Sequence, residues 1–495
     1  MRALQELVFD NTWLTLPPSL WARVDPQGLR DPRLVSFNAE AAQLLGLDPA
    51  VADDPDFTAF ASGNLVLPGS APLAQKYTGH QFGVYNPDLG DGRGLLLGEV
   101  RNATCSTDGR KWDIHLKGAG TTPFSRGADG RAVLRSSIRE YLCSEAMHGL
   151  GIPSTRALCL VTGSDTVWRE SPERGATLIR LSETHTRFGH FEYLFYSQQT
   201  AALTQLADYV ITHHFPAHAG NPDRYALLLR DVIARTARMI AHWQAAGFNH
   251  GVMNTDNMSI LGVTFDYGPF AFFDEYDAQR ICNHSDHAGR YAFHRQPQIG
   301  LWNLHALAQA FSPLVPREQL IELLQGYEGI LTDTFSRLMN GKLGLRESHP
   351  GDPSLLQELF DLMQESKVDY PHFFRQLCDI VTDTGNTVTS ANNLRDHITN
   401  RERFDAWFAR YHARLVAEGS VDQERAARMR RVNPKYVLRN WLLQVAIDKA
   451  NSGDYSEVNL LLKVAQQPFD EWPRHERLAA LPPDWSKHME ISCSS

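Results

Sequence analysis

The chain has 495 residues, 43% of them hydrophobic, which is enough for about two to four domains or for one large enzyme with appended segments. Its formal charge is -9, so it has no net positive field to attract nucleic acid, and we expect no nucleic-acid partner. No apolar run approaches about 18 residues and the first ten residues do not resemble a secretion signal, so we expect a soluble, cytoplasmic protein without membrane contact.

Residues 1–70 alternate short apolar clusters with Pro and Gly, which is typical of a packed N-terminal extension. One short helix is predicted within it, from Ala39 to Leu45. Asn38 precedes this helix as an N-cap residue, and Gly46 follows it as a stop.

Between 71 and 197 the pattern changes to strand-like pieces joined by glycine loops, with one helix among them. Apolar residues recur at four-residue spacing after Asp129 and Gly130, and Gly149 ends this helix. The predicted strands are Gly94 to Val100, Trp112 to Leu116 and Arg156 to Val161. These features predict a small, strand-rich lobe.

The chain beyond residue 197 is mostly helical, and we divide it into 198–330 and a helical C-terminal extension at 331–495. Clear helices are predicted from Tyr225 to Ala246 and from Pro434 to Lys449, the second with Asn433 as its N-cap residue. The fold class is therefore predicted to be α+β. A strand-rich N-lobe followed by a helical C-lobe is the two-lobed plan of protein kinases.

A glycine-rich segment, Gly79 to Gly94, precedes the first of these strands. Glycines let backbone N–H groups approach a phosphate closely, and Arg93 adds a fork of donors. Taken alone, the segment is equally explained as solvated β-turns, because Asp-Gly and Asn-Pro are ordinary turn signals.

A lysine and a glutamate follow in the order found in protein kinases. Lys117 ends the second strand beside Gly118, where it can reach nucleotide phosphates, and Glu140 on the predicted helix is a candidate partner for it. The alternative for Glu140 is a solvent-facing residue paired with a surface arginine.

The strongest local signal is His250-Gly-Val-Met-Asn-Thr-Asp-Asn257, followed by Asp266-Tyr-Gly268. Kinase-like enzymes bind Mg²⁺ through an Asn of the catalytic loop and the Asp of a similar tripeptide, because a hard cation prefers oxygen ligands. Two unrelated turns are the alternative. The order of glycine loop, Lys, helix Glu, Asn and Asp argues against coincidence.

One position departs from the kinase pattern. Small-molecule kinases of this fold carry an aspartate two residues after the catalytic-loop histidine, and here that position is Val252. Ordinary phosphoryl transfer is therefore in doubt, and the nearest carboxylate that could accept a proton belongs to Asp256.

Two arginines between the predicted lobes, Arg180 and Arg187, are further candidates for phosphate binding, although each alone is more typical of a structural ion pair. A group of polar residues further on lacks thiolates and is better explained as fixing a loop than as a zinc site. This group comprises His284, Asp286, His287 and His294.

Several longer motifs resemble the selenoprotein O family, and the resemblance covers nearly the whole chain. They are Tyr77-Thr-Gly-His-Gln-Phe-Gly, Gly90-Asp-Gly-Arg-Gly-Leu-Leu-Leu-Gly-Glu, His115-Leu-Lys-Gly-Ala-Gly, Asp129-Gly-Arg-Ala-Val-Leu-Arg-Ser, His250-Gly-Val-Met-Asn-Thr-Asp-Asn-Met-Ser and Cys493-Ser-Ser. The resemblance implies a kinase-like fold that binds ATP in an inverted orientation. It also implies transfer of AMP to Ser, Thr or Tyr hydroxyl groups of proteins, including the enzyme itself.

The resemblance also implies roles for individual residues. Asp256 becomes the proton acceptor, Asn257 and Asp266 become ligands of Mg²⁺ or Mn²⁺, and Glu140 pairs with Lys117. An inverted nucleotide also accounts for Val252, because the carboxylate that receives the proton must move with the reacting phosphorus. The residues placed around the nucleotide are Gly90, Gly92, Arg93, Lys117, Asp129, Gly130, Arg180 and Arg187.

Other functions remain open at this point. A γ-phosphotransferase is disfavoured by Val252, and an ATP-binding pseudokinase scaffold is disfavoured by the complete set of Lys117, Asn257 and Asp266. UMP transfer from UTP is also open, because phosphate-binding groups do not distinguish bases. The sequence identifies neither the protein substrates nor the oligomeric state.

The six cysteines are scattered singly, without a C-x-x-C pair. Cys493 is third from the end, and Cys282 lies sixteen residues past Asp266, in the segment that corresponds to a kinase activation loop. We therefore predict a regulatory disulfide between Cys282 and Cys493. The alternative is an inert tail thiol with Cys282 buried. In relatives with selenocysteine, that residue occupies the position of Cys493.

Overall fold

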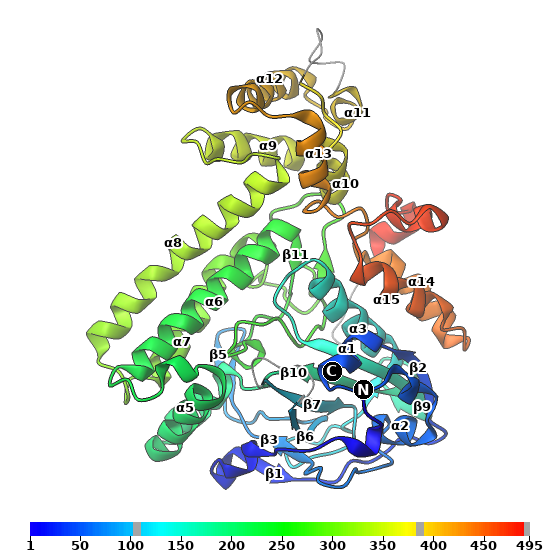
Figure 1. Ribbon diagram of the computed structural model, residues 1–495, viewed down its shortest axis with the longest axis vertical. Helices are drawn as coiled ribbons and strands as arrows, with labels where there is room; N and C mark the ends of the chain where they lie inside the picture. The colour runs from blue at the N-terminus through cyan, green and yellow to red at the C-terminus, as the bar shows by residue number, and fades with distance from the viewer. Residues whose placement is uncertain (102–109, 383–390, 490–495) are drawn as a thin grey trace.

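The computed structural model describes residues 1–101, 110–382 and 391–489 (Figure 1). It is a mixed α+β structure with one large antiparallel sheet and many helices, which confirms the predicted fold class. The strands are β1 Trp21–Arg23, β2 Arg33–Phe37, β3 Leu73–Gln75, β4 Gly79–Gln81, β5 Val84–Asn86, β6 Gly94–Arg101, β7 Lys111–Lys117, β8 Ala132–Val133, β9 Arg156–Trp168, β10 Pro172–Ser182, β11 Phe248–Asn249 and β12 Ala271–Phe272. The helices are α1 Ala39–Leu44, α2 Pro55–Ala61, α3 Leu134–Gly149, α4 Phe188–Tyr196, α5 Thr200–His214, α6 Arg224–Ala246, α7 Gln296–Ala310, α8 Arg317–Lys342, α9 Asp352–Ser366, α10 Tyr370–Leu377, α11 Asn392–Arg395, α12 Arg401–Ala417, α13 Asp422–Arg430, α14 Asn440–Asn451 and α15 Ser456–Gln466.

The large sheet has the strand order β1-β3-β6-β7-β10-β9-β2, and β8 adds to β10. Successive residues of a strand point to opposite faces, so one face of β10 carries Leu178 and the other carries Ile179. Leu178 shares a core with Ile138 of α3, whereas Ile179 shares a separate core with Phe57 of α2. The sheet is therefore buried on both faces, by α3 on one side and by α1 and α2 on the other.

The predicted elements of the strand-rich part are confirmed. The three expected strands appear as β6, β7 and β9, and the expected helix is α3. Asn38 caps α1 as predicted, because its side chain accepts from the backbone N–H groups of Glu40 and Ala41. The helix predicted from Tyr225 is α6, and it ends at Gly247 with a φ of +67°.

The helix predicted from Pro434 begins later than expected, at Asn440 as α14, so the predicted start and N-cap are wrong. The Asn433 side chain donates to the carbonyl oxygen of Lys342 at 2.9 Å instead of capping a helix. The N–H group of Lys435 donates to Pro468 O at 2.9 Å, so tertiary contacts hold this segment outside the helix.

The helices that follow the sheet form three groups in Figure 1. Helices α6 and α8 run beside one another, and α9 to α13 pack around a second core that includes Phe373, Phe404 and Trp407. Helices α14 and α15 then return to pack against α3. Strands β1 and β2, which come from the predicted N-terminal extension, belong to the large sheet, and α8 continues through the predicted boundary at residue 330. The domain boundaries stay predictions.

Among the helices of the described ranges, none combines the length and apolarity that a membrane span requires.

Candidate active site

The strand alternation of β7 and β10 brings the first site residues together. Arg180 lies opposite His115 in the sheet register, and Lys117 lies opposite Leu178. Because paired residues point to the same face, all of these side chains face α3. Glu140 of α3 forms an ion pair with Lys117, and its other oxygen accepts from Arg180 at 3.2 Å.

Asp266 lies where the two arginines converge. Its φ is +60°, a conformation that is uncommon for residues other than glycine and that concentrates at functional sites. Its carboxylate accepts from the guanidinium groups of Arg180 and Arg187. Burial opposes ionisation, but the surrounding positive charges, led by Arg187, outweigh it and hold the pKa of Asp266 well below its usual range.

Arg187 is fixed by contacts with both parts of the site. Its guanidinium lies between the rings of Tyr77 and Phe265, with distances of 4.7 and 4.5 Å from the ring centroids. It also donates to the backbone oxygen of Asp256 at 2.6 Å. Arg187 therefore joins the Asp266 loop to the loop that carries Asp256.

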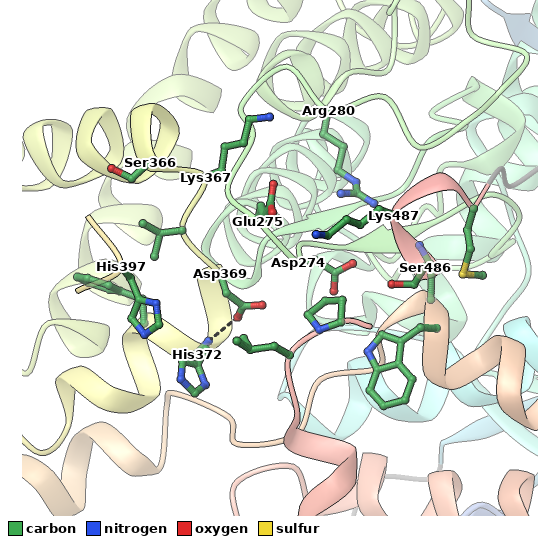
Figure 2. Close-up of a pocket in the computed structure, with 17 residues that line it drawn as sticks. Asp274, Glu275, Arg280, Ser366, Lys367, Asp369, His372, His397, Ser486 and Lys487 are labelled. Carbon is green, nitrogen blue, oxygen red and sulfur yellow. Dashed lines mark hydrogen bonds between the residues drawn. The ribbon is translucent and has the colours of Figure 1, made fainter. Parts of the chain in front are cut away.

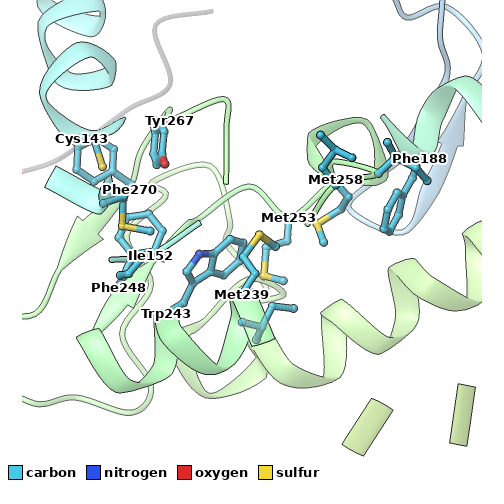
Figure 3. Packing of buried hydrophobic residues seen from close by; sticks show 14 of the residues in the cluster. Cys143, Ile152, Phe188, Met239, Trp243, Phe248, Met253, Met258, Tyr267 and Phe270 are labelled. Carbon is cyan, nitrogen blue, oxygen red and sulfur yellow. The ribbon is translucent and has the colours of Figure 1, made fainter. Parts of the chain in front are cut away.

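The loop from His250 to Asn257 rests on the main core. Figure 3 shows Met253 and Met258 of this region among buried apolar residues near Trp243. His250 faces the carbonyl oxygen of Phe265 with its Nε2 atom at 3.1 Å, which ties this loop to the residue before Asp266. The Asn257 amide donates to Val252 O at 3.0 Å, and its side-chain oxygen is the atom that can serve as a ligand.

Asp256 is buried beneath the β4–β5 hairpin. Gln81 of β4 donates to Asp256 Oδ2 at 3.3 Å, while Oδ1 is buried without a hydrogen-bond partner among the described residues. A Cβ atom at Gly79 would lie 3.0 Å from Oδ1, so the hairpin closely approaches the carboxylate at a glycine. Burial raises the pKa of Asp256 to about 7, although the nearby Arg187 charge favours ionisation.

The orientation of the Gln81 amide is set by a chain of hydrogen bonds. The N–H group of Asp88 donates to Asn86 Oδ1 at 3.0 Å, and Asn86 Nδ2 donates to Gln81 Oε1 at 3.1 Å. The Gln81 NH₂ group is thereby directed at the carboxylate of Asp256.

Two glycine loops form a wall beside Lys117. A Cβ atom at Gly90 would lie 2.7 Å from the ring of Phe124, and one at Gly92 would lie 3.0 Å from Phe124 O. Gly130 has a φ of +68°, and its Cβ atom would lie 2.1 Å from the backbone of Gly120. The close packing of the two loops therefore requires glycine at these positions.

The other two predicted nucleotide residues lie at the edge of this wall. The carbonyl oxygen of Arg93 accepts from Gly118 N–H at 2.7 Å, so Arg93 is adjacent to Lys117. Asp129 forms an ion pair with Arg169 at 2.7 Å, and a hydrogen bond from Arg169 lowers the pKa of Asp129. Asp129 is thus held at the rim, away from the Asp266 cluster.

The sequence interpretation missed a buried network that supports Arg180. Arg180 Nη2 donates to His115 Nδ1 at 3.1 Å, and His115 Nε2 faces Asp91 Oδ2 at 3.3 Å. Burial lowers the pKa of His115, which matches the neutral ring that this bonding requires. The signal was present in β7, where polar residues alternate with apolar ones up to Lys117 and mark one polar face.

The side-chain oxygen atoms of the two loops that Arg187 joins are of the kind that a hard divalent cation prefers. Asp266 and Asn257 supply carboxylate and amide oxygens, which Mg²⁺ and Mn²⁺ prefer. Oδ1 of Asp256, which is buried without a hydrogen-bond partner among the described residues, belongs to the residue next to Asn257 and is a third candidate oxygen. The polar group after β12 instead fixes its own loop, since the side chain of Asp286 accepts from the N–H group of Tyr291 at 2.7 Å.

A separate cavity of about 680 Å³ lies between the segment after β12, the α9–α10 connection and the C-terminal segment (Figure 2). Arg280 and Met489 both line it, so the end of the described chain lies near the segment that carries Cys282. The Cys282 thiol is buried, faces Asn249 O at 3.5 Å, and has its pKa raised to about 12 by burial. Cys493 lies outside the described residues, so the disulfide stays a prediction.

The arrangement as a whole suits a polyphosphate. Lys117, Arg180 and Arg187 converge in a buried space, and among the described residues their ion-pair partners are Glu140 and Asp266. Guanidinium and ammonium groups form strong, charge-assisted hydrogen bonds with phosphate oxygens, so phosphate can take the place of a carboxylate beside them. A carboxylate with a raised pKa belongs to Asp256, whose backbone oxygen accepts from the same Arg187 nitrogen that contacts Asp266.

Comparison with known proteins gives a consistent result over the whole chain. A family model described as "Protein adenylyltransferase SelO" matches residues 3–466. A protein of Myxococcus xanthus (strain DK1622) named "Protein nucleotidyltransferase YdiU" is 54% identical over 495 residues, which is all of both chains. Proteins of the same name from Azotobacter vinelandii and Vibrio parahaemolyticus are each 51% identical, again over the full length of both chains.

Proposed function

The chain belongs to the protein adenylyltransferase SelO family and is a protein nucleotidyltransferase, and we propose that it transfers AMP from ATP to Ser, Thr or Tyr hydroxyl groups of proteins. The partners are protein substrates, and the enzyme also modifies itself. The sheet with α3 serves as the N-lobe of a kinase-like fold, and the helices that follow serve as the C-lobe. ATP binds between the two lobes.

The observation that carries this proposal is the convergence of Lys117, Arg180 and Arg187 on two carboxylates. In the proposed complex, phosphate oxygens accept from the two arginines and from Lys117, while Glu140 keeps the lysine in position. The glycine wall that includes Gly90 and Gly130 supplies backbone N–H groups.

Asn257 and Asp266 would hold Mg²⁺ or Mn²⁺. When bound, the cation would neutralise charge on the phosphate oxygens and favour departure of pyrophosphate. Asp266 is ready for this role because the low pKa produced by its arginine contacts keeps it ionised. In the complex, phosphate oxygens would accept the hydrogen bonds that Arg180 and Arg187 donate to Asp266 in the free protein. The Asp266 carboxylate would then be available to the cation.

Asp256 acts as the proton acceptor. The acceptor hydroxyl oxygen attacks the α-phosphorus, the bond from this phosphorus to the bridging oxygen of pyrophosphate breaks, and the hydroxyl proton moves to the Asp256 carboxylate. Burial beneath the β4–β5 hairpin supports this role, since a base with a pKa near 7 can accept and release a proton at neutral pH. An inverted ATP would bring the α-phosphorus to Asp256.

Purified protein incubated with ATP labelled at the α- or the γ-phosphate tests the proposal. We expect label on protein, including the enzyme itself, from α-labelled ATP only. Label from the γ-position alone would identify a kinase, and binding of ATP without transfer would identify a pseudokinase scaffold. Parallel incubation with α-labelled UTP tests the alternative of UMP transfer, which would be preferred if UTP labelled the protein faster at equal concentration.

We also propose that Cys493 regulates the enzyme by pairing with Cys282 under mild oxidation, with both thiols losing a proton and an electron to the oxidant. The burial of Cys282 requires its segment to open before the thiol reacts. Non-reducing peptide mapping tests this pairing, and the expected result is a crosslinked peptide whose reduction changes transfer activity. An oxidised protein without this peptide would exclude the switch.

A further inference from the structure

A small cavity of about 160 Å³ lies where the ends of α6 and α8 meet the start of α10 and the segment before α14. Most of its lining is apolar and comes from parts of the chain that are far apart in sequence. The apolar lining residues include Leu150, Ile152, Phe272, Leu338, Val437 and Phe469. The proposed active site contributes none of its named residues to this lining.

Apart from Tyr370, the ionisable side chains that line the cavity are all basic. They belong to His242, Arg337 and Lys342, and the lining contains no Asp or Glu. The hydroxyl group of Tyr370, which also lines the cavity, already donates to Ala245 O at 2.8 Å. A ligand entering this space would therefore meet positive charge and an apolar wall.

Lys342 is the unusual member of this group. The residue is 7% exposed, and its ammonium lies 4.9 Å from the ring centroid of Phe374 and 5.6 Å from that of Tyr370. Burial lowers its pKa to about 8, and the thiol of Cys378 is the one group that opposes this shift, with no carboxylate contributing among the described residues. A buried ammonium without a carboxylate partner is costly, which is why buried charges are normally paired.

We propose that this cavity is a binding site for a small carboxylate with an apolar body of about six carbon atoms, whose carboxylate pairs with Lys342. The size follows from the volume, because an apolar cavity of about 150 Å³ accommodates benzene. The carboxylate follows from the charge, since the cavity lining includes Lys342 but no Asp or Glu, and an anion beside Lys342 would supply the partner that the described residues do not. Arg337 is exposed at the rim, where it would attract the anion.

One residue of the cavity lining belongs to the short strand pair β11–β12, which lies between the two loops of the active site. Phe272 of β12 lines the cavity and pairs with Phe248 of β11 in the two-stranded ribbon. This ribbon leads into His250 on one strand and follows Asp266 on the other. A ligand packed against Phe272 would therefore restrict opening of the ribbon between the two catalytic loops.

Benzoate is the probe, and calorimetric titration of the full chain measures its binding. We expect a Kd of about 1 mM or tighter, and binding at least about tenfold weaker for benzyl alcohol and for benzylammonium, which have the same body without the negative charge. Equal binding of benzoate and benzyl alcohol, or no binding of benzoate, would overturn the proposal.

The variant Lys342→Met removes the charge and keeps the length of the side chain. We expect it to lose benzoate binding at least about tenfold while binding benzyl alcohol as before. Lys463→Met, at an exposed lysine of α15, is the matched control and should bind benzoate like the original chain. If Lys342→Met does not fold, Lys342→Gln replaces it, and unchanged benzoate affinity in the folded variant would exclude the site.

Hydrogen exchange gives a second readout that does not depend on enzymatic activity. With benzoate bound, the amides of β11 and β12 should exchange more slowly than in the free protein, because local opening of the ribbon is opposed. Protection confined to other segments would mean that benzoate binds elsewhere.

Discussion

Replacement of the buried Lys342 by methionine should stabilise the protein at neutral pH, and the gain should disappear as the pH rises. Burial lowers the pKa of Lys342 to about 8, whereas an unfolded lysine has a pKa near 10.4. Between these values the unfolded state binds more protons than the folded state, so stability rises with pH. The full difference corresponds to about 3 kcal/mol, of which about 2 kcal/mol falls between pH 7 and 9.5.

The assay is urea denaturation of both proteins at intervals from pH 7 to 9.5, with the free energy of unfolding compared at each pH. Both proteins share the titration of His242 and Tyr370 beside the cavity and the charge of Arg337. The Cys378 thiol, whose pKa is raised by burial, is also present in both, so the difference between the two proteins reports mainly on Lys342. Lys463→Met is the control and should differ from the original chain by a constant. A gap between Lys342→Met and the original chain that stays within about 0.5 kcal/mol across this range would refute the reasoning.

Three further predictions concern transfer. Asp266→Ala or EDTA should abolish labelling, because the cation loses a charged ligand or is removed, and full activity in EDTA would exclude the metal assignment. Asp256→Ala should lose transfer but bind ATP normally, whereas Lys117→Ala should bind ATP at least about tenfold more weakly, and normal transfer by Asp256→Ala would exclude it as the base. Gln81→Leu should lower kcat about 10- to 100-fold at unchanged KM for ATP, since a hydrogen bond to a charged group is worth about 1.5–3 kcal/mol. Asn86→Asp should have a similar effect by reorienting the Gln81 amide, and an unchanged kcat in both variants would show that this contact does not position Asp256.

Much of the strand-rich part could be predicted because its signals are local. The alternation in β7 and the four-residue spacing in α3 are properties of short segments, and each element forms where it was expected. The pairing of Lys117 with Glu140 could also be anticipated from the order of the motifs. The spacing of the motifs is thus informative wherever one residue on a strand meets one on the next helix.

The late start of α14 shows where local signals fail. Asn433 and Pro434 form a good helix start by themselves, but the Asn433 amide donates to the carbonyl oxygen of Lys342 in the last turn of α8. The backbone N–H groups of Lys435 and Tyr436 both donate to the carbonyl oxygen of Pro468. These partners are distant in sequence, so propensity alone could not predict that the helix begins at Asn440.

The site around Asp256 was beyond sequence reasoning for the same physical reason. Gln81 and Asp256 are 175 residues apart, and their contact exists only because the β4–β5 hairpin folds over the loop at Thr255–Asn257. The glycine at position 79 was interpreted as part of a phosphate loop, yet a Cβ atom there would meet Asp256. One glycine-rich segment therefore has two tasks in the structure, since its first part covers the proposed base and its last part lies beside the proposed phosphate site.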